Sequence, residues 1–430
     1  MSLPSCVVYC LLIHDPEWER SLNIIQQIHI SLSDWYHTEQ PYLIQRYLSP
    51  NNTDGGLPSP DSFLFNDARD APTYQFQPRK RYLLRIVSMS ALACTQFHID
   101  GHVLSVVGVD GVHTHPQDTK TIDVCAGQSY DVIVTGLKNQ RKSKQWIAKM
   151  LTDMMTNGPP PDDHLSVIGK ADYRPRGRML NIPWKTITPQ WAPQTALNDM
   201  TLRPLDGQKI LRHVQNEIRL RTNQTYYEDI GTRIGIGYEP WVEPKIPTLY
   251  TALSTGQHAD DPSTYGVGVD PWVLNSNEVV QIYMENPQPW PHPMHLHGHS
   301  FQVVARGEGV WDRNEAALPL IPMKRNTVVI PALGYFVLRF RADNPGVWLF
   351  HCHIDLHLAG GMASVFVESP EKLQRQQTIP SAGAGLCFNN GQCNFGNCAC
   401  GAGKISTKDA ADQCNSIFNS QNMNYGALIS

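Results

Sequence analysis

The stretch Met294-His-Leu-His-Gly-His299 decides the fold, because a close copy of it, Phe97-His-Ile-Asp-Gly-His102, occurs 197 residues earlier. Apolar residues follow both stretches at matching positions: Phe301 and Val303-Val304 after the later one, and Leu104 and Val106-Val107 after the earlier one. Further along, residues 335–338 (Tyr-Phe-Val-Leu) echo residues 130–133 (Tyr-Asp-Val-Ile) at an offset of 205. Self-similarity of this kind indicates one structural unit used twice.

Most of the chain consists of short segments rich in Val, Ile, Leu, Phe and Tyr, separated by Gly, Pro and Asn. This alternation is typical of all-β domains. The clearest of these segments are Ile24–Leu32, Arg81–Ser88, His102–Val109, Ser129–Val134, Glu278–Met284, Ser300–Ala305 and Gly334–Phe340. Long helical periodicity is hard to find, and the best helical candidates lie near Asp199 and over Gly207–Val214.

The repeat and the strand pattern together predict an all-β chain with two Greek-key β-sandwich domains. We expect the first domain at residues 18–190 and the second at residues 207–370, with a linker at 191–206. A stretch at residues 1–17 precedes the two domains, and a short cysteine-rich tail at 371–430 follows them.

The composition excludes several classes of protein. The 430 residues are 41% hydrophobic and 17% charged, which fits compact domains and excludes a disordered chain. A net charge of −4 gives no basic field for a polyanion, so we expect no nucleic-acid partner. The apolar run Cys6–Ile13 is too short to span a membrane and lacks the basic residues that precede the core of a signal peptide. Neither a membrane segment nor a signal peptide is therefore visible.

The ten cysteines indicate an oxidising compartment. Five of them lie in the last 44 residues: Cys387, Cys393, Cys398, Cys400 and Cys414. Their spacing, with no histidine among them, favours a small disulfide knot over a Cys₄ zinc site. If Cys352 binds a metal, nine cysteines remain and one must stay unpaired, and we expect this one to be Cys6 or Cys10.

The second copy of the repeat differs from the first in its histidines. Seven of the 17 histidines fall within the 66 residues from 292 to 357. They form two clusters, His292-Pro-Met-His295-Leu-His297-Gly-His299 and His351-Cys352-His353-Ile-Asp-Leu-His357. The first copy has Asp100 in place of His297. In the first copy Trp146 is followed by Ile-Ala-Lys-Met, whereas in the second copy Trp348 is followed by Leu-Phe-His-Cys-His. Only the second copy is therefore equipped to hold metal.

Alternation along β-strands sorts these side chains into two sites, because Cys352 must point opposite to its two histidine neighbours. Cys352, His357 and His292 make the His₂Cys set of a blue-copper centre, with Met362 as the weak axial thioether. The opposite face gathers imidazoles suited to copper that performs oxygen chemistry: His295, His297, His351 and His353. The alternatives are ordinary polar loop residues or structural zinc, but one cysteine between two histidines of a strand cannot bring all three to one tetrahedral ion.

At these residues the chain resembles the multicopper oxidases, the family of laccases, fungal ferroxidases and ascorbate oxidase, whose C-terminal domain is marked by HPxHLHGH and HCHxxxH. The resemblance covers roughly residues 12–370 and implies that both sandwiches are cupredoxin-like. The copper ligands that it implies are His292, Cys352 and His357 for type 1, with Met362 axial, His295 for type 2, and His297, His351 and His353 for the type 3 pair. It further implies a secreted oxidoreductase that takes single electrons from phenols or similar small-molecule reductants and passes them to O₂, giving water.

The chain departs from the family pattern in one respect. The family's usual first domain supplies an HxHG and a second HxH motif, and this chain has neither. Residues 14–16 and 31–37 resemble the junction into the second domain and its early strand, so residues 1–17 are interpreted as the remnant of a junction with a missing first domain. The isolated His113-Thr-His115 is interpreted as part of a solvated turn.

The missing motifs limit the expected function. Without a complementing first cupredoxin domain, we expect copper at the type 1 site only, because type 2 and type 3 copper would lack half of their imidazoles. The alternatives to a complete oxidase of phenols are a non-catalytic blue-copper electron-transfer fragment and an Fe(II) oxidase.

Asp34 is the candidate residue on the substrate side. It resembles the carboxylate that, in fungal laccases, lies beside the exposed edge of a copper-binding histidine and accepts a phenol proton, whereas ferroxidases tend to carry Glu there. An Asp at this place favours phenols. The predicted catalytic residues are therefore Asp34, Cys352 and His357, and the alternative for Asp34 is an ordinary surface carboxylate on a strand.

Overall fold

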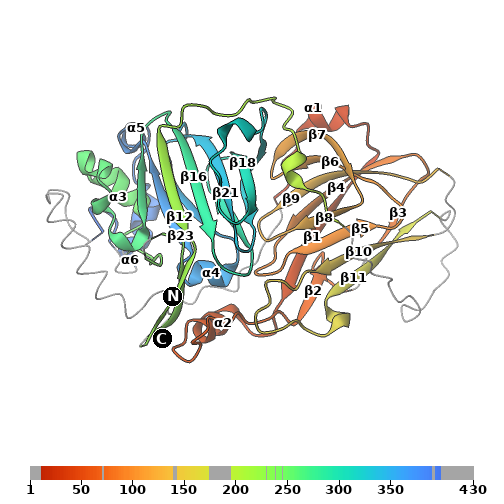
Figure 1. Cartoon of the computed structure of the whole chain (residues 1–430), viewed down its shortest axis with the longest axis horizontal. Coiled ribbons are helices and arrows are strands. Elements are labelled where there is room, and N and C mark those ends of the chain that lie inside the picture. The colour runs from red at the N-terminus through yellow and green to blue at the C-terminus, as the bar shows by residue number, and fades with distance from the viewer. Residues whose placement is uncertain are drawn as a thin grey trace.

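Two β-sandwiches lie side by side in the computed structural model, the N-terminal one at the right of Figure 1 and the C-terminal one at the left. The structure describes residues 11–69, 72–138, 143–173, 195–228, 230–237, 239–244, 246–389 and 393–398. The prediction of an all-β chain with two sandwiches is confirmed. The boundaries given above for the domains, the linker and the tail remain predictions.

The first sandwich has a six-stranded and a five-stranded sheet, with strand orders β2-β1-β4-β9-β6-β7 and β3-β11-β10-β5-β8. Its strands are β1 (Gln26–Trp35), β2 (Ser62–Phe65), β3 (Thr73–Gln75), β4 (Arg81–Ser88), β5 (Thr95–Ile99), β6 (Leu104–Val109), β7 (Val112–Thr119), β8 (Thr121–Val124), β9 (Ser129–Thr135), β10 (Lys144–Met150) and β11 (Ser166–Asp172). Alternate apolar side chains fill the space between the sheets, where Leu84, Val132 and Trp146 are buried.

The second sandwich has two five-stranded sheets, with strand orders β12-β16-β21-β18-β19 and β15-β23-β22-β17-β20. The strands of the first sheet are β12 (Asn216–Arg221), β16 (Val279–Asn286), β18 (Phe301–Glu308), β19 (Met323–Arg325) and β21 (Gly334–Arg341). Those of the second are β15 (Pro271–Leu274), β17 (His292–Leu296), β20 (Thr327–Ile330), β22 (Gly346–Cys352) and β23 (Ala363–Glu368). A separate hairpin consists of β13 (Asn223–Tyr227) and β14 (Gly231–Gly235).

The two sandwiches repeat one topology, since β1-β4-β9-β6-β7 corresponds to β12-β16-β21-β18-β19 and the other two sheets correspond in the same way. The strand register corrects one part of the sequence alignment. Phe97 lies opposite Ala148, and its counterpart Met294 lies opposite Cys352. In the structure, Ala148 is therefore the counterpart of Cys352. Aligning Trp146 with Trp348 makes Met150 the counterpart of Cys352 instead. Register follows backbone pairing and turn length, which one shared tryptophan does not fix.

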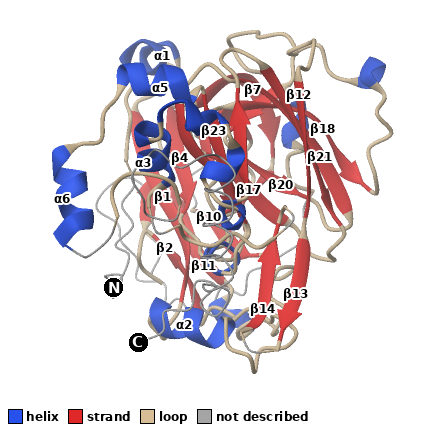
Figure 2. Ribbon diagram, turned by 90° about the vertical axis from the view of Figure 1, so that its left-hand side faces the viewer, coloured by secondary structure: helices blue, strands red, loops and turns tan. Residues whose placement is uncertain are grey.

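Helices are short and lie outside the sheets: α1 (Pro16–Ser21), α2 (Gln40–Tyr47), α3 (Thr248–Ser254), α4 (Asp355–Ala359), α5 (Pro370–Gln376) and α6 (Ser381–Asn389). Turns of 3₁₀ helix occur at Asp162–His164, Asp199–Thr201, Gly256–Asp260, Pro262–Thr264, Val267–Val269 and Glu315–Ala317. α3, α5 and α6 lie on the outer side of the second sandwich, which faces the viewer in Figure 2. None of the helices that the structure describes is long and apolar enough to cross a membrane.

The predicted helical candidates are largely wrong. Near Asp199 there is only a single 3₁₀ turn, and Gly207–Val214 contains no helix. The backbone of this second segment pairs with a neighbouring segment instead, because the N–H of Ile210 donates to the carbonyl of Leu320 at 2.9 Å. Contacts with the second sandwich therefore override the weak helical pattern.

The described cysteines bear out the expectation of disulfides. Cys94 and Cys125 are joined across the ends of β5 and β8. In the tail, Cys393 and Cys398 are both disulfide-bonded, whereas Cys387 on α6 is a free thiol and does not belong to the predicted knot. Cys352 is buried and free, and the other four cysteines, Cys6, Cys10, Cys400 and Cys414, lie outside the described residues.

A buried ion cluster joins the two sandwiches. Arg325 on β19 is fully buried, and its guanidinium donates to both carboxylate oxygens of Asp110, at 2.9 and 3.1 Å, and to Asp199 at 2.8 Å. Asp110 lies in the turn between β6 and β7 and also accepts the backbone N–H of Thr327 at 3.3 Å. Paired charges of this kind form strong hydrogen bonds. The cluster therefore fixes one end of the second sandwich against the first.

Candidate metal centre

Two neighbouring strands of the second sandwich carry most of the candidate ligands. β17 lies between β20 and β22, and its Met294 and His295 pair with Cys352 and His351 of β22. Paired residues share a face and successive residues alternate. His295 and His351 therefore project to one side of the sheet, and Cys352 projects to the other, as the sequence predicts.

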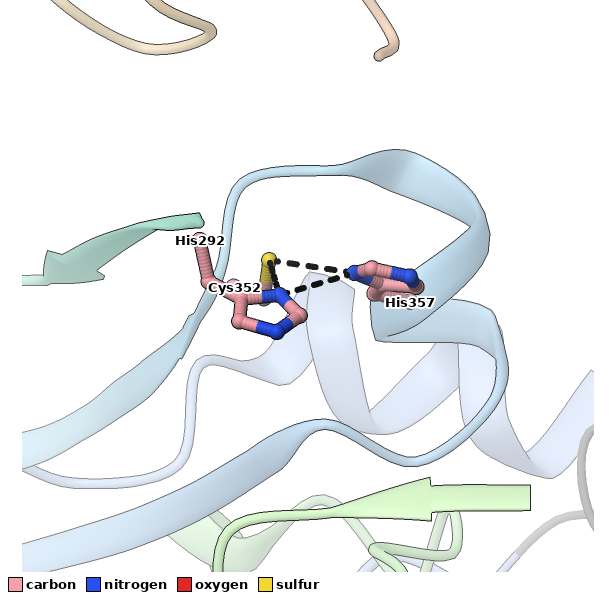
Figure 3. Close-up of side chains that lie close together, drawn as sticks. All are labelled: His292, Cys352 and His357. Carbon is pink, nitrogen blue, oxygen red and sulfur yellow. Dashed lines mark hydrogen bonds between the residues drawn. The ribbon is translucent and has the colours of Figure 1, made fainter. Parts of the chain in front are cut away.

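The first group of ligands consists of His292, Cys352 and His357, whose side chains converge in Figure 3. The Sγ atom of Cys352 lies 3.8 Å from Nδ1 of His292 and 3.6 Å from Nδ1 of His357, and the two nitrogens are 3.2 Å apart. An ion in a trigonal site, with bonds of ~2.0 Å to nitrogen and ~2.3 Å to sulfur, separates its ligands by ~3.5–3.7 Å. All three side chains are buried.

Gln288 determines which nitrogen of His292 faces the sulfur. Nε2 of His292 lies 2.7 Å from Oε1 of Gln288, so Nε2–H donates to the amide oxygen and Nδ1 keeps its lone pair toward Cys352. Sequence reasoning missed Gln288, since it lies outside both histidine motifs. Its only signal is a polar residue four positions before His292, between two prolines.

Burial keeps the first group uncharged in the absence of metal. It lowers the pKa of His357 to about 3, and together with the neighbouring His357 it holds the pKa of His292 well below its usual range. Burial also raises the pKa of the Cys352 thiol. Both imidazoles are therefore in the neutral form that binds metal, and the thiol must lose its proton when a metal binds.

Met362 lies next to this group. Its side chain is fully buried, its backbone N–H donates to the carbonyl of His357 at 2.9 Å, and its carbonyl accepts the N–H of Cys352 at 3.0 Å. These two bonds hold Met362 between the helix that carries one ligand and the strand that carries another. The structure thus brings the predicted axial residue beside the predicted ligands.

The second group consists of His295, His297 and His351, with one ligand nitrogen of each within 4.8 Å of the others. The Nε2 atoms of His297 and His351 are 3.1 Å apart. Nδ1 of His295 lies 2.9 Å from the carbonyl of Asn326, and Nδ1 of His351 lies 2.9 Å from the carbonyl of Cys352. Each carbonyl accepts the Nδ1–H, so the Nε2 atom of each ring is free for a metal.

His353, the fourth predicted member, lies at the edge of the second group. Its ring centre is 5.7 Å from that of His351 and 5.8 Å from that of His295. Its Nδ1 atom is buried without a hydrogen-bond partner, which is uncommon for a buried polar atom and leaves this nitrogen available to a ligand. Gly127 of the first sandwich covers the ring so closely that a Cβ there would lie 2.2 Å from it.

The imidazoles of the second group are also neutral at physiological pH. Burial, with the neighbouring His297 and His353, lowers the pKa of His295 to about 4. Burial lowers the pKa of His351 to about 3 and lowers those of His297 and His353 as well. The group therefore presents uncharged nitrogen donors on the face of the sheet opposite to Cys352.

Asp34 is buried, whereas the resemblance implies a carboxylate beside the exposed edge of a copper-binding histidine, within reach of a substrate. Its Oδ1 atom accepts the backbone N–H of Ala91 at 2.8 Å, and its Oδ2 atom accepts those of Leu92 and Ala93 at 2.8 and 2.9 Å. Burial raises the pKa of Asp34, against the effect of these hydrogen bonds. The contacts of this carboxylate hold a turn, so the role of a substrate-side proton acceptor remains a prediction that no contact supports.

His113 and His115 lie on β7 and not in a turn as predicted. The ring of His113 stacks on Trp18 of α1 with 3.9 Å between the ring centres, and His115 is exposed. Pro116 does not break the strand, because β7 is at the edge of its sheet.

The donor chemistry of the first group fits copper. A thiolate with two imidazoles and a nearby thioether is the donor set of a blue-copper site, whereas tetrahedral zinc takes a fourth strong ligand from nitrogen, sulfur or oxygen. The second group offers imidazoles alone, which also suit copper.

Comparison with known proteins identifies one family at both sandwiches. Two models of the family described as multicopper oxidase match, one over residues 26–168 and the other over residues 241–372. "Iron transport multicopper oxidase FET3" of Gibberella zeae is 35% identical over 394 residues, which cover 90% of this chain and 62% of that protein. "Iron transport multicopper oxidase fetC" of Epichloe festucae is 34% identical over 412 residues, which cover 94% and 64%. The chain thus spans less than two thirds of the length of these curated relatives.

Solved structures agree with this result. Fet3p, described as a multicopper oxidase that functions in iron import, superimposes with a TM-score of 0.83 at 29% identity, over 89% of this chain and 73% of that one. The laccase of Botrytis aclada gives a TM-score of 0.65 at 20% identity, over 94% and 70%, and this likeness shows the fold alone. The matches at both sandwiches, with the ligand groups described above, show that the chain belongs to the multicopper oxidase family.

Proposed function

We propose that this chain holds the type 1 copper of a multicopper oxidase and half of the histidine ligands of its oxygen-reducing copper cluster. The family implies copper as the metal. The observation that carries the proposal is the buried triangle of His292, Cys352 and His357, because a thiolate and two imidazoles out of contact with water are the donors of a blue-copper centre. Met362 is the proposed axial donor.

The two ligand groups are linked by one tripeptide. Cys352 is covalently bonded to His351 and His353, which belong to the second group. Copper bound at Cys352 supplies a one-electron acceptor, and the thiolate and its two flanking peptides provide a short covalent route from it to the opposite face of the sheet. This arrangement separates the oxidation of the reductant from the reduction of O₂ in space.

In this proposal His295 binds type 2 copper, and His297, His351 and His353 bind the type 3 pair. Among the described residues, only two groups of side chains bring three or more ligand atoms together, and both have been described above. We therefore assign the remaining imidazoles of the cluster to a complementing first cupredoxin domain, which would cover the face that carries His297.

Fe(II) is the reductant that the findings favour. Two relatives at 34–35% identity are named for iron transport, and the structure with a TM-score of 0.83 is described as functioning in iron import. The case for phenols rested on Asp34, whose carboxylate oxygens are engaged by three backbone N–H groups. Phenols are the second candidate, since laccases belong to the same family.

We place the protein in an oxidising, extracytoplasmic compartment. The Cys94–Cys125 disulfide supports this location, because structural disulfides persist outside the reducing cytosol.

The test of the reductant is anaerobic reduction of the copper-loaded chain. We expect an intense thiolate-to-copper band in the visible that Fe(II) bleaches faster than a phenol at equal concentration. Cys352→Ser is the matched control and should show no band. Bleaching by the phenol alone would refute the choice of Fe(II), and copper uptake without any visible band would refute the type 1 assignment.

A non-catalytic electron-transfer protein is the rival function, because the described residues supply the three strong donors of the first site but only half of the imidazoles that the family uses for its cluster. Oxygen uptake separates the two. We expect negligible O₂ consumption by the chain alone and turnover after addition of a separately made first domain that carries the HxHG and HxH motifs. Vigorous oxygen uptake without that domain would contradict the division of ligands proposed here.

A further inference from the structure

The loop that carries His357 and Met362 is too short to be stable in this conformation by itself. It runs over residues 354–362, from the end of β22 to the start of β23, and its helix α4 has five residues. A helix of this length is not stable by itself in water. The position of two of the four proposed copper donors therefore depends on what the loop packs against.

The first sandwich holds the start of this loop. The backbone N–H of Asp355 donates to the carbonyl of Ala91 at 2.9 Å. Ala91 lies between β4 and β5, in the turn whose three N–H groups bind the carboxylate of Asp34. Cys94, which follows this turn, is tied to Cys125. A buried carboxylate is a strong acceptor for backbone N–H groups, so Asp34 holds the turn that contains Ala91. This turn then holds the start of α4 through the hydrogen bond from Asp355 to Ala91.

A second contact holds the end of the loop. A Cβ on Gly360 would lie 3.1 Å from the ring of Tyr47 and 3.1 Å from the side chain of Ile234, so both side chains abut the glycine. Tyr47 is the last residue of α2 in the first sandwich and is buried. The N–H of Ile234 donates to the carbonyl of Gly360 at 3.0 Å, and that of Trp241 donates to the carbonyl of Gly361 at 2.8 Å.

The hairpin that carries Ile234 is itself tied to the first sandwich. Arg233 donates to the carbonyl of Leu48 at 3.1 Å, and Thr232 donates to the carbonyl of Asn52 at 2.9 Å. Both carbonyls lie just beyond α2, and α2 packs against α4. In Figure 1 α2 lies at the lower edge of the molecule and α4 lies above it.

We propose that the copper-free sandwich positions the ligand loop of the metal centre, with Asp34 as the positioning residue at its start and Tyr47 as the positioning residue at its end. The inference rests on the proposed function in that it assigns copper ligands to this loop. Neither residue forms a hydrogen bond with the side chains of the three proposed ligands. Asp34 acts through the backbone N–H groups of the turn at Ala91, and Tyr47 acts through its ring against Gly360. Together they set the positions of Met362 and of His357, whose Nδ1 atom lies 3.6 Å from Cys352 Sγ.

Amide hydrogen exchange in the metal-free chain tests the contact at the start of the loop. Asp34→Asn removes part of the acceptor for the turn, so exchange at the Asp355 amide should become about tenfold faster or more, since loss of a hydrogen bond to a charged group is worth at least that factor. Asp61→Asn is the matched control, because Asp61 accepts a single backbone N–H, from His37, and is half exposed. Unchanged exchange at Asp355 in folded Asp34→Asn would overturn the proposal.

The spectrum of the copper-loaded chain tests the contact at the end of the loop. Tyr47→Leu should shift the visible band and the reduction potential, whereas Tyr47→Phe, which keeps the ring against Gly360, should restore both. Tyr42→Leu is the control on the same helix, where the side chain is 62% exposed. A folded Tyr47→Leu variant with the wild-type band and potential would overturn the role of Tyr47.

A milder variant keeps the test decisive if Tyr47→Leu does not fold. Gly360 has a φ of −76°, which alanine adopts freely, so Gly360→Ala adds one methyl group against Tyr47 and Ile234 without backbone strain. It should shift the band, and an unshifted band would count against the proposal. If the wild-type chain shows no band at all, the proposed function fails, while the exchange experiment still decides whether Asp34 positions the loop.

Discussion

The Nδ1 atoms of His292 and His357 face each other at 3.2 Å beside the sulfur of Cys352. Because the other nitrogen of His292 donates to Gln288, its Nδ1 atom is an acceptor, and a proton on His357 is what joins the two rings in the metal-free chain. A cation bound between these side chains would meet three ligand atoms that are already close together and buried. The fold therefore forms in advance the site that we propose for copper.

The first prediction follows from this arrangement. Copper should raise the temperature of unfolding, because a ligand that binds only the folded state stabilises it, by about 4 kcal/mol when its concentration is a thousand times its Kd. Thermal unfolding with and without copper measures the effect. The Cys352→Ser variant should lose most of the shift, and an equal shift in that variant would show that the stabilising copper binds elsewhere.

The second prediction concerns Met362. Replacing it with Leu should raise the reduction potential of the bound copper, because loss of a weak axial donor removes electron density that favours Cu(II). Spectroelectrochemical titration of the visible band gives the potential. An unchanged or lower potential in Met362→Leu would show that the thioether is not an axial donor.

The histidine motifs predict which side chains lie together on each face of the sheet, because alternation along a strand is a rigid geometric rule, while His353 lies at the edge of its group and the role of these residues as copper ligands stays a proposal. Cys352 and His351 lie on opposite faces for that reason alone. The strand segments were predictable for the same reason, and Arg81–Ser88 coincides with β4. Short apolar runs with turn residues between them leave little else for the chain to form.

Contacts between distant segments could not be predicted from the sequence. Gln288 orients His292 through a turn whose shape no spacing reveals, and Gly127 reaches His353 from the other sandwich. The resemblance gives Asp34 the role of a proton acceptor beside a copper-binding histidine, but its oxygens bind backbone N–H groups that lie 57 to 59 residues further along. The sequence does not show whether a carboxylate contacts a substrate or accepts hydrogen bonds from a turn.

The third prediction concerns the ion cluster between the sandwiches. Arg325→Met should destabilise the chain by about 3–5 kcal/mol, because it leaves the carboxylate of Asp110 buried without its ion-pair partner and leaves Asp199 paired with Arg306 alone. Chemical denaturation measures the change. Arg313→Met is the control, since Arg313 pairs with Glu217 while 43% exposed and should cost at most about 1 kcal/mol. Equal losses in the two variants would contradict a special role for the buried cluster.

The fourth prediction is a pH dependence of stability. Burial raises the pKa of Asp270 to about 6, and its Oδ2 atom has no hydrogen-bond partner. The folded state therefore holds this proton more tightly than the unfolded state, whose pKa is about 3.9, and stability falls by up to about 3 kcal/mol as the pH rises from about 4 to above 6.

Asp270→Asn removes the buried charge. The substitution should therefore increase the free energy of unfolding more at pH 7.5 than at pH 4. Denaturation of both proteins at the two pH values gives the difference. A gain that is the same at pH 4 and pH 7.5 would show that ionisation of Asp270 does not cost stability.

The most direct test of the central claim is a copper titration of the metal-free chain followed at the thiolate-to-copper band. We expect a band that grows in proportion to added copper and stops at about one copper per chain, and that is absent in the Cys352→Ser variant. A chain that saturates with copper and stays colourless, or that keeps its band after Cys352→Ser, would contradict the assignment of His292, Cys352 and His357 as a blue-copper site.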